Sequence, residues 1–254
     1  MIADPEAQAW RRRARPLLGT LVEVGFGAAE AAPAAPAEAL FEAAFAAVME
    51  VQRALSRFDP ESDVSRFHAL PRGQSLQMRP ATRAVLTAAA ELQRLSGGDF
   101  DIALASAPQG WQCEGDLLHK RDAATRLDAG GIAKGHAVDL AVQALIDRGC
   151  AAGWVNAGGD LRVFGHVDLP VQLRDEATGG VRPFARLRDA AFATSHFGPG
   201  SRSALVSGRR SARTHVSVAA PLCLWADALT KIVAIRGDTA DAILTRFQAC
   251  AWQH

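Results

Sequence analysis

The sequence has few lysines, no paired cysteines and no long apolar run. Its four cysteines lie far apart in the 254 residues and form no C-x-x-C pair, so we expect reduced thiols rather than a zinc site. No apolar stretch approaches the length of a membrane span. The formal net charge of +1 provides no basic surface for nucleic acid. These absences argue against zinc-finger, membrane-spanning and nucleic-acid-binding proteins.

What is present fits a globular protein with a large core. Hydrophobic residues make up 49% of the chain, which is enough for a buried core. The length of 254 residues allows one large domain or two small ones. Arg11, Arg12 and Arg13 are followed by Ala14-Arg15-Pro16 and not by a long apolar region. The N-terminus therefore does not resemble a signal peptide, and a cytoplasmic location is expected.

A glycine-rich turn that leads into a helix is the central feature, over residues 127–149. Gly130, Gly131 and Gly135 permit a close backbone approach or a positive φ, and Gly149 can end the helix. One apolar face follows a 3.6-residue period and consists of Val138, Ala141, Val142, Leu145 and Ile146. The unpaired N–H groups at the start of such a helix favour a phosphate.

A lysine stands inside this turn although the chain otherwise uses arginine. Only three of the 28 basic residues are lysines, and one of them is Lys134. A compact ammonium suits a phosphate contact. The alternative is a tight connection into the helix with a solvated lysine. The glycine pattern matches neither G-x-G-x-x-G nor a Walker A loop, so the two usual nucleotide-binding folds are not supported.

Periodicity and turn residues predict helices interspersed with hairpin-like strand pairs. The expected helices cover residues 40–55, 82–95, 225–235 and 238–249, with a short helix capped by Ser62. The expected strands cover residues 17–24, 153–155, 161–164, 167–173, 184–187, 192–195 and 214–219. Residues 28–37 read as a connector and 198–213 as a mobile segment. The pattern favours an α+β fold with mixed or antiparallel sheets and packed helices.

A second stretch with chemical potential is Ala226 to Lys231. On a helix, Asp227, Thr230 and Lys231 share one face. Carboxylate and hydroxyl oxygens together suit Mg²⁺, which usually retains waters and adds phosphate oxygens of a substrate. The spacing alone favours a simpler interpretation, an ion pair between Asp227 and Lys231 with Thr230 uninvolved, because such helix pairs are common and weak.

With these stretches in view, the chain resembles the ApbE family of FAD:protein FMN transferases from about Arg15 to Gly237. The resemblance rests on ordered blocks: a first strand over Pro16 to Val24 with its Gly19-Thr20, a Leu-Ser-x-aromatic segment before a small helix over Leu55 to Phe67, Gly98 to Asp101, Asp128 to Asp139, Asn156 to Asp160, Ala193 to Ser195, and Ala226 to Leu229. It implies an ApbE-like α+β domain over residues 15–254. The preceding residues 1–14 are expected to form a flexible tail.

The resemblance also implies an activity, its cofactors and its residues. FAD would lie in a cleft with Mg²⁺ on its pyrophosphate, and FMN would pass to a Thr or Ser hydroxyl of an acceptor flavoprotein while AMP leaves. Catalytic roles would belong to Asp227 and Lys134, and metal contacts to Ala133, Asp227 and Thr230. The expected FAD-binding residues are Leu18, Phe58, Asp101, Asp128, Lys134, Gly158, Gly159, Asp160 and Ser195.

Two departures from the family pattern matter. Lys231 stands where the family usually has the threonine of the metal site, so an ammonium replaces a hydroxyl. Thr230 could substitute for that threonine, or Lys231 could take over part of the metal's charge role. The family's His-x-x-Asp-Pro-x-Thr-Gly segment has no counterpart near residues 203–210. His215, a candidate catalytic residue, and His196 lie nearby and could act as the base, while the simpler interpretation is that each is uninvolved. Two alternatives therefore stay open: an FAD-binding module without transfer, and a pyrophosphatase that splits FAD into FMN and AMP.

Overall fold

The computed structural model describes residues 10–27, 36–103, 106–174, 179–198, 205, 211, 214–237 and 241–253. Its helices are α1 (Ala37–Leu55), α2 (Asp63–Ala69), α3 (Pro80–Ser96), α4 (Ala133–Ile146), α5 (Cys223–Arg236) and α6 (Asp241–Arg246). Its strands are β1 (Trp10–Leu17), β2 (Thr20–Gly27), β3 (Ser75–Gln77), β4 (Trp111–Glu114), β5 (Leu117–Lys120), β6 (Gly153–Ala157), β7 (Asp160–Phe164), β8 (Leu169–Arg174), β9 (Val181–Leu187), β10 (Ala191–His196), β11 (His215–Ala220) and β12 (Cys250–Gln253). The predicted α+β class is confirmed.

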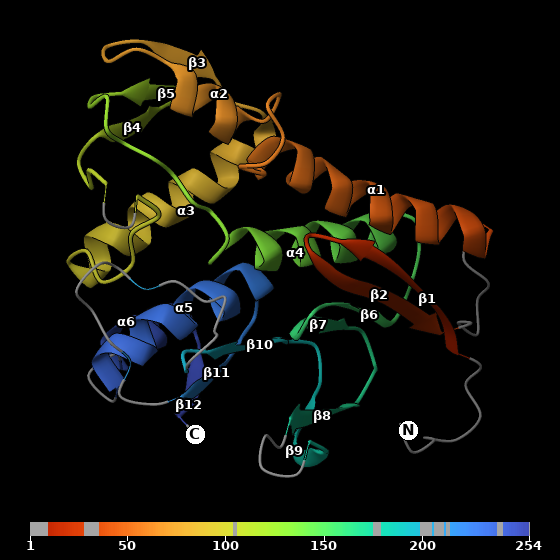
Figure 1. Ribbon diagram of the computed structural model, residues 1–254. Coiled ribbons are helices and arrows are strands. Elements are labelled where there is room, and N and C mark those ends of the chain that lie inside the picture. The colour runs from red at the N-terminus through yellow and green to blue at the C-terminus, as the bar shows by residue number, and fades with distance from the viewer. Residues whose placement is uncertain are drawn as a thin grey trace.

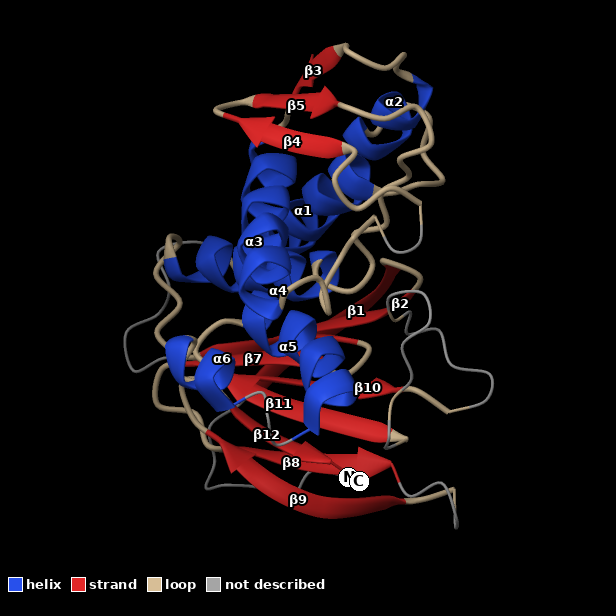
Figure 2. Ribbon diagram, turned by 90° about the vertical axis from the view of Figure 1, so that its left-hand side faces the viewer, coloured by secondary structure: helices blue, strands red, loops and turns tan. Residues whose placement is uncertain are grey.

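The helices lie between a large sheet and a small one (Figures 1 and 2). The large sheet has the strand order β1-β2-β6-β7-β10-β11-β12, and each neighbouring pair is antiparallel. The small sheet has the order β3-β5-β4, and β8 pairs with β9 in a separate hairpin. The sheets are therefore antiparallel, one of the two arrangements that the sequence favoured.

Packing of helix on helix forms the centre of the core. Helix α1 packs on α4, α4 packs on α5, and α5 packs against β10 and β11. The apolar face predicted for α1 is buried, including Val48 and Val51, and so is that of α4 at Val138 and Val142. Ile146, predicted to belong to the α4 face, is instead 39% exposed at the last residue of the helix. The burial of these faces supplies most of the stability of the helices. Within the described ranges, no helix is long and apolar enough to cross a membrane.

The N-terminal region differs from the prediction of one strand at 17–24 behind a tail over 1–14. Leu18 and Gly19 have φ values of +55° and +70° and turn the chain, so β1 and β2 form a hairpin around them. Residues 10–14 belong to β1. The arginines of this strand obscure it in the sequence. The guanidinium groups of Arg13 and Arg15 lie over aromatic rings of α1 and also pair with α1 glutamates.

The C-terminal region also differs from its prediction. The helix expected over 238–249 is present only as α6, since Gln248 takes a φ of +51° beyond its end. The chain then forms β12, which pairs with β11 and was not predicted. Most of the 28–37 connector and of the 198–213 segment falls outside the described residues.

Candidate functional site

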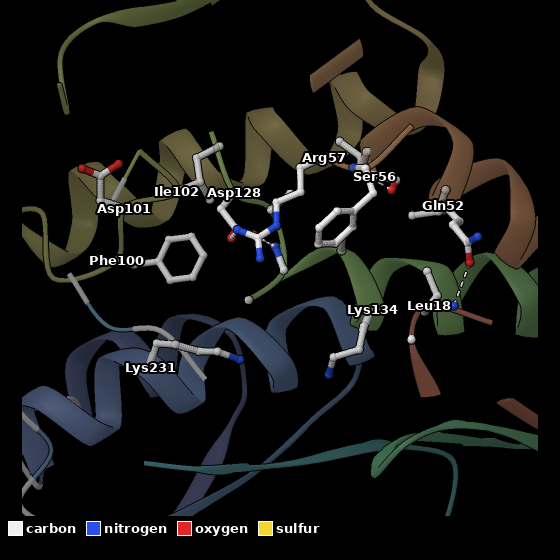
Figure 3. A pocket seen from close by; sticks show the side chains of 18 of the residues that line it. Leu18, Gln52, Ser56, Arg57, Phe100, Asp101, Ile102, Asp128, Lys134 and Lys231 are labelled. Atoms are coloured by element: carbon white, nitrogen blue, oxygen red, sulfur yellow. Dashed lines mark hydrogen bonds and ion pairs between the residues drawn. The ribbon is translucent and has the colours of Figure 1, made fainter. Parts of the chain in front are cut away.

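A cavity of about 510 Å³ lies where α1, α4 and α5 meet the loops between the two sheets (Figure 3). This volume is in the usual range for small-molecule sites. The residues that line the cavity include Leu18, Gly19, Ser56, Arg57, Phe58, Phe100, Asp101, Ile102, Asp128, Gly130, Gly131, Ala133, Lys134 and Lys231. The glycine turn and the two lysines of α4 and α5 therefore share one cavity.

The glycine turn is organised by its aspartate. The Asp128 carboxylate accepts the N–H of Gly130 at 2.8 Å, and the backbone N–H of Asp128 donates to the carbonyl of Ile102 at 2.7 Å. Two glycines, neither with a positive φ, allow close approach: Gly135 to backbone and Gly131 to a side chain. A Cβ on Gly135 would lie 2.2 Å from the Cys223 carbonyl oxygen, and one on Gly131 would lie 3.2 Å from Cε of Lys231. Glycine therefore allows α4 to approach α5 and leaves room for the lysine.

Helix α5 is held in place by a carboxylate from α4. The Asp139 oxygens accept the N–H groups of Cys223 and Leu224 at 2.9 and 2.8 Å. The guanidinium of Arg162 on β7 donates to the same carboxylate at 2.9 Å. Burial raises the pKa of Asp139, although these donors oppose the shift. Asp139 thus caps the helix that carries Asp227 and Lys231.

Lys134 forms an ion pair that fixes its position at the cavity. Its ammonium contacts the carboxylate of Asp160, which is 2% exposed at the start of β7. Burial and the charge of Asp227 raise the pKa of Asp160 to about 6 against the opposing effect of the lysines. Burial alone would lower the pKa of Lys134, but the charges of Asp227 and Asp160 outweigh it and raise that pKa.

The Asn-Ala-Gly-Gly-Asp block places this carboxylate without touching the cavity. Gly158 and Gly159 have φ values of +63° and +105°, and the Asn156 side chain accepts the Gly159 N–H at 2.9 Å. This tight turn leads directly into Asp160, which contacts Lys134. None of Gly158, Gly159 and Asp160 lines the cavity. The block therefore acts on the cavity through Lys134, whose ammonium is positioned by Asp160.

Lys231 binds three oxygen atoms around a buried carboxylate. Its ammonium pairs with the carboxylate of Asp227, donates to the Asp227 carbonyl at 2.9 Å and donates to the Ser195 hydroxyl at 3.3 Å. Burial would raise the pKa of the fully buried Asp227, but the charges of Lys134 and Lys231 prevail and lower it. Asp227 is therefore a carboxylate that is neutralised inside the protein.

The hydroxyl groups near Asp227 are also engaged. The Thr230 hydroxyl donates to the Asp227 carbonyl at 2.6 Å and lies 2.8 Å from the Ser195 hydroxyl. The second carboxylate oxygen of Asp227 accepts the Gly135 N–H at 3.3 Å. Neither Thr230 nor Ser195 lines the cavity. Thr230 is thus part of a buried network and is not the uninvolved neighbour of an exposed pair.

This donor set does not fit the predicted magnesium site. Mg²⁺ demands near-octahedral oxygen ligands, and an ammonium already contacts the Asp227 carboxylate that would attract it. The Thr230 hydroxyl is directed at its own helix carbonyl. Among the described residues, no group of three or more His, Cys, Asp or Glu side chains could hold a metal ion. The arrangement favours a lysine ammonium in place of a divalent ion.

Of the residues predicted to bind FAD, Leu18, Phe58, Asp101, Asp128 and Lys134 lie on the wall of the same cavity, whereas Gly158, Gly159, Asp160 and Ser195 do not. Leu18 adopts its positive φ there, and its N–H donates to the Gln52 side chain at 2.7 Å. Phe58 is 83% exposed, with the Arg57 guanidinium 4.9 Å from its ring. Burial raises the pKa of Asp101. The structure thus gathers Leu18, Phe58, Asp101 and Asp128 around one space, while their binding roles stay predictions.

His215, the predicted base, lies elsewhere. It stacks on His196 with ring centroids 4.6 Å apart and does not line the cavity. Most of the 203–210 segment, where a family motif is missing, falls outside the described residues. Gln52 and Arg57 line the cavity without having been predicted. Gln52 belongs to no motif, and Arg57 occupies the variable position of the Leu-Ser-x-aromatic segment.

Comparisons with known proteins give the family and the fold. The sequence model of the ApbE family matches residues 18–121 and 111–251. No curated protein matches the chain. The flavin transferase ApbE from Vibrio cholerae is 19% identical with a TM-score of 0.83, and the similarity covers 97% of this chain and 94% of that one. The Pseudomonas stutzeri flavinyl transferase ApbE in its apo form is 21% identical with a TM-score of 0.81, over 98% and 92% of the chains. An ApbE protein from Thermotoga maritima is 19% identical with a TM-score of 0.81, over 95% and 93%.

Proposed function

The chain belongs to the ApbE family, and we propose that it is an FAD:protein FMN transferase. It would transfer FMN from FAD to a Thr or Ser hydroxyl of an acceptor flavoprotein and release AMP. The observation that carries this proposal is a cavity lined both by two ammonium groups and by an exposed aromatic side chain. Lys134 and Lys231 offer charge for a pyrophosphate, and Phe58 offers a flat surface for a ring system.

Transfer of FMN requires that the phosphates of FAD be positioned and that their negative charge be neutralised. The acceptor oxygen attacks the phosphorus on the FMN side, a new P–O bond forms, and the bond from that phosphorus to the bridging oxygen breaks. The acceptor hydroxyl loses its proton, and AMP leaves with the bridging oxygen and the electron pair of the broken bond. In such transfers the protein contributes mainly by orienting the phosphates and balancing their charge. Lys134 and Lys231 are the groups of this cavity suited to that role.

Ring recognition would come from other residues on the cavity wall. Phe58 and Phe100 offer apolar ring surface, and Asp101 and Asp128 offer carboxylate oxygens to the N–H and hydroxyl groups of a dinucleotide. The raised pKa of Asp101 follows from burial at this wall. His215 as the base that takes the acceptor proton remains a prediction, and replacement of His215 by alanine tests it through the rate of transfer.

The test is a transfer assay with the purified protein. FAD and a peptide with a candidate acceptor threonine are incubated with Mg²⁺ or with a chelator, and AMP and flavin-labelled peptide are quantified. AMP with labelled peptide supports the transferase. AMP with free FMN indicates a pyrophosphatase, and intact bound FAD indicates a binding module. Lys134→Met should abolish product, whereas Arg72→Met, which removes an exposed charge outside the cavity, should not.

The same assay tests the sequence-based prediction that the transfer requires Mg²⁺. That prediction assigned oxygen ligands to Ala133, Asp227 and Thr230. The contacts of Lys231 argue for the opposite result, because its ammonium already neutralises the Asp227 carboxylate.

A further inference from the structure

The Lys231 ammonium is surrounded by oxygen atoms, as a bound metal ion would be. Its ammonium has a carboxylate oxygen and a carbonyl oxygen of Asp227 and the hydroxyl of Ser195 as neighbours. The lysine side chain is 8% exposed, and that of Asp227 is fully buried. A lysine on a surface helix would extend into water and pair weakly. Here the side chain instead runs alongside Gly131, where any Cβ would crowd it, and its end lies in a set of oxygen donors.

The two lysines of the cavity are matched by two carboxylates behind them. Lys134 pairs with Asp160 and Lys231 pairs with Asp227, and each lysine also interacts electrostatically with the other carboxylate. Both lysines line the cavity, whereas neither aspartate does. Figure 3 shows the two lysine side chains extending along the same side of the cavity from α4 and α5. The buried charges sum to zero, and the positive members are the ones a ligand meets.

We propose that the Lys231 ammonium is the resident cation of this site, so that the protein binds a dinucleotide pyrophosphate without a divalent metal ion. The inference rests on the proposed function for its substrate class, a flavin dinucleotide. Its basis is that both carboxylate oxygens of Asp227 already have donors, one the ammonium and one the Gly135 N–H. A divalent ion here would meet a positive charge where it needs a ligand.

The direct test uses the wild-type protein and does not depend on catalysis. The affinity for FAD is measured by calorimetry in a chelator and again in excess Mg²⁺. The expected result is the same affinity in both buffers. A gain of about tenfold or more with Mg²⁺ would overturn the proposal, since it would mean that Lys231 gives way to the metal on binding. Mn²⁺, followed by its paramagnetic signal, is the probe for a divalent site without nucleotide, and no tight binding is expected.

Substitutions at position 231 should convert the site. Lys231→Thr removes the ammonium and adds a hydroxyl beside Asp227, so we expect Mn²⁺ binding to appear and FAD binding to depend on Mg²⁺. Lys231→Met removes the charge without adding a ligand and should weaken FAD binding in both buffers by about tenfold or more. Arg72→Thr is the control, because it removes an exposed charge outside the cavity. Circular dichroism establishes that each variant is folded before binding is compared.

The outcomes separate this inference from the proposed function. FAD binding that is independent of Mg²⁺, with no flavin transfer in either buffer, would retain the role of Lys231 and reject the transferase. Transfer that occurs only with Mg²⁺ would retain the transferase and reject the role of Lys231. Transfer in a chelator by the wild type, and only with Mg²⁺ by Lys231→Thr, would support both.

Discussion

Asp139 should be the main structural link between α4 and the helix that carries the buried charges. Its carboxylate accepts the Cys223 and Leu224 N–H groups at 2.9 and 2.8 Å and the Arg162 guanidinium at 2.9 Å. Replacement by alanine leaves two N–H groups at the start of α5 without an acceptor. Each buried group of this kind costs about 1–3 kcal/mol. Alanine also removes the cost of burying the carboxylate, which is the effect that raises the pKa of Asp139.

The net loss in the free energy of unfolding is therefore expected to be about 3 kcal/mol for Asp139→Ala. Asp139→Asn keeps one acceptor oxygen and should lose about half as much. Urea unfolding followed by tryptophan fluorescence measures both, and Asp147→Ala, at an exposed carboxylate just beyond α4, is the matched control. A loss below about 0.5 kcal/mol in the alanine variant would refute the idea that this cap holds α5, since that is the effect of an ordinary surface substitution.

Three further results are expected. Gly135→Ala should destabilise the protein by about 1–3 kcal/mol, because its Cβ would lie 2.2 Å from the Cys223 carbonyl oxygen. An unchanged midpoint of urea unfolding would contradict the close packing of α4 and α5. Lys134→Met should weaken FAD binding by about tenfold or more in a fluorescence titration, whereas unchanged affinity would show that FAD does not contact this ammonium. Burial lowers the pKa of His136 from 6.5 to about 4, so the unfolded chain binds the proton at a higher pH than the folded protein does. The free energy of unfolding should therefore fall as the pH drops through this range, by at most about 3 kcal/mol. His136→Leu should lack this part of the acid sensitivity, and parallel curves of stability against pH for the two proteins would disprove the assignment.

Elements with one continuous buried face could be predicted from sequence. The apolar positions of α1 and α4 recur at helical spacing, and Ser62 caps α2 by accepting the Ser65 N–H as its position suggested. The turn between β6 and β7 was also predictable, because Gly158 and Gly159 supply the positive φ values that other residues avoid. In these cases the local sequence contains the physical cause of the structure.

Elements defined by distant partners could not be predicted in the same way. Strand β12 exists through its pairing with β11, which lies more than 30 residues earlier. Half of the eight residues of β1 are arginines, and two of them stack on α1 rings. The small sheet of β3, β5 and β4 has strands of three or four residues, too short for a clear alternation. Their positions depend on tertiary contacts that no local pattern records.

The helix segment that carries Asp227 and Lys231 shows how burial decides between two interpretations of one spacing. From sequence, the pair was either an ordinary helix ion pair or part of a metal site. The ion pair is present, yet both members are buried and Ser195 and Thr230 complete a network around them. An exposed pair of this kind contributes little, whereas a buried carboxylate must keep a cation beside it. Gly135 permits α5 to pack closely on α4, and Asp139 holds the start of α5 by hydrogen bonds. This packing buries Asp227 beside the cavity, and the Lys231 side chain supplies the cation that the carboxylate needs.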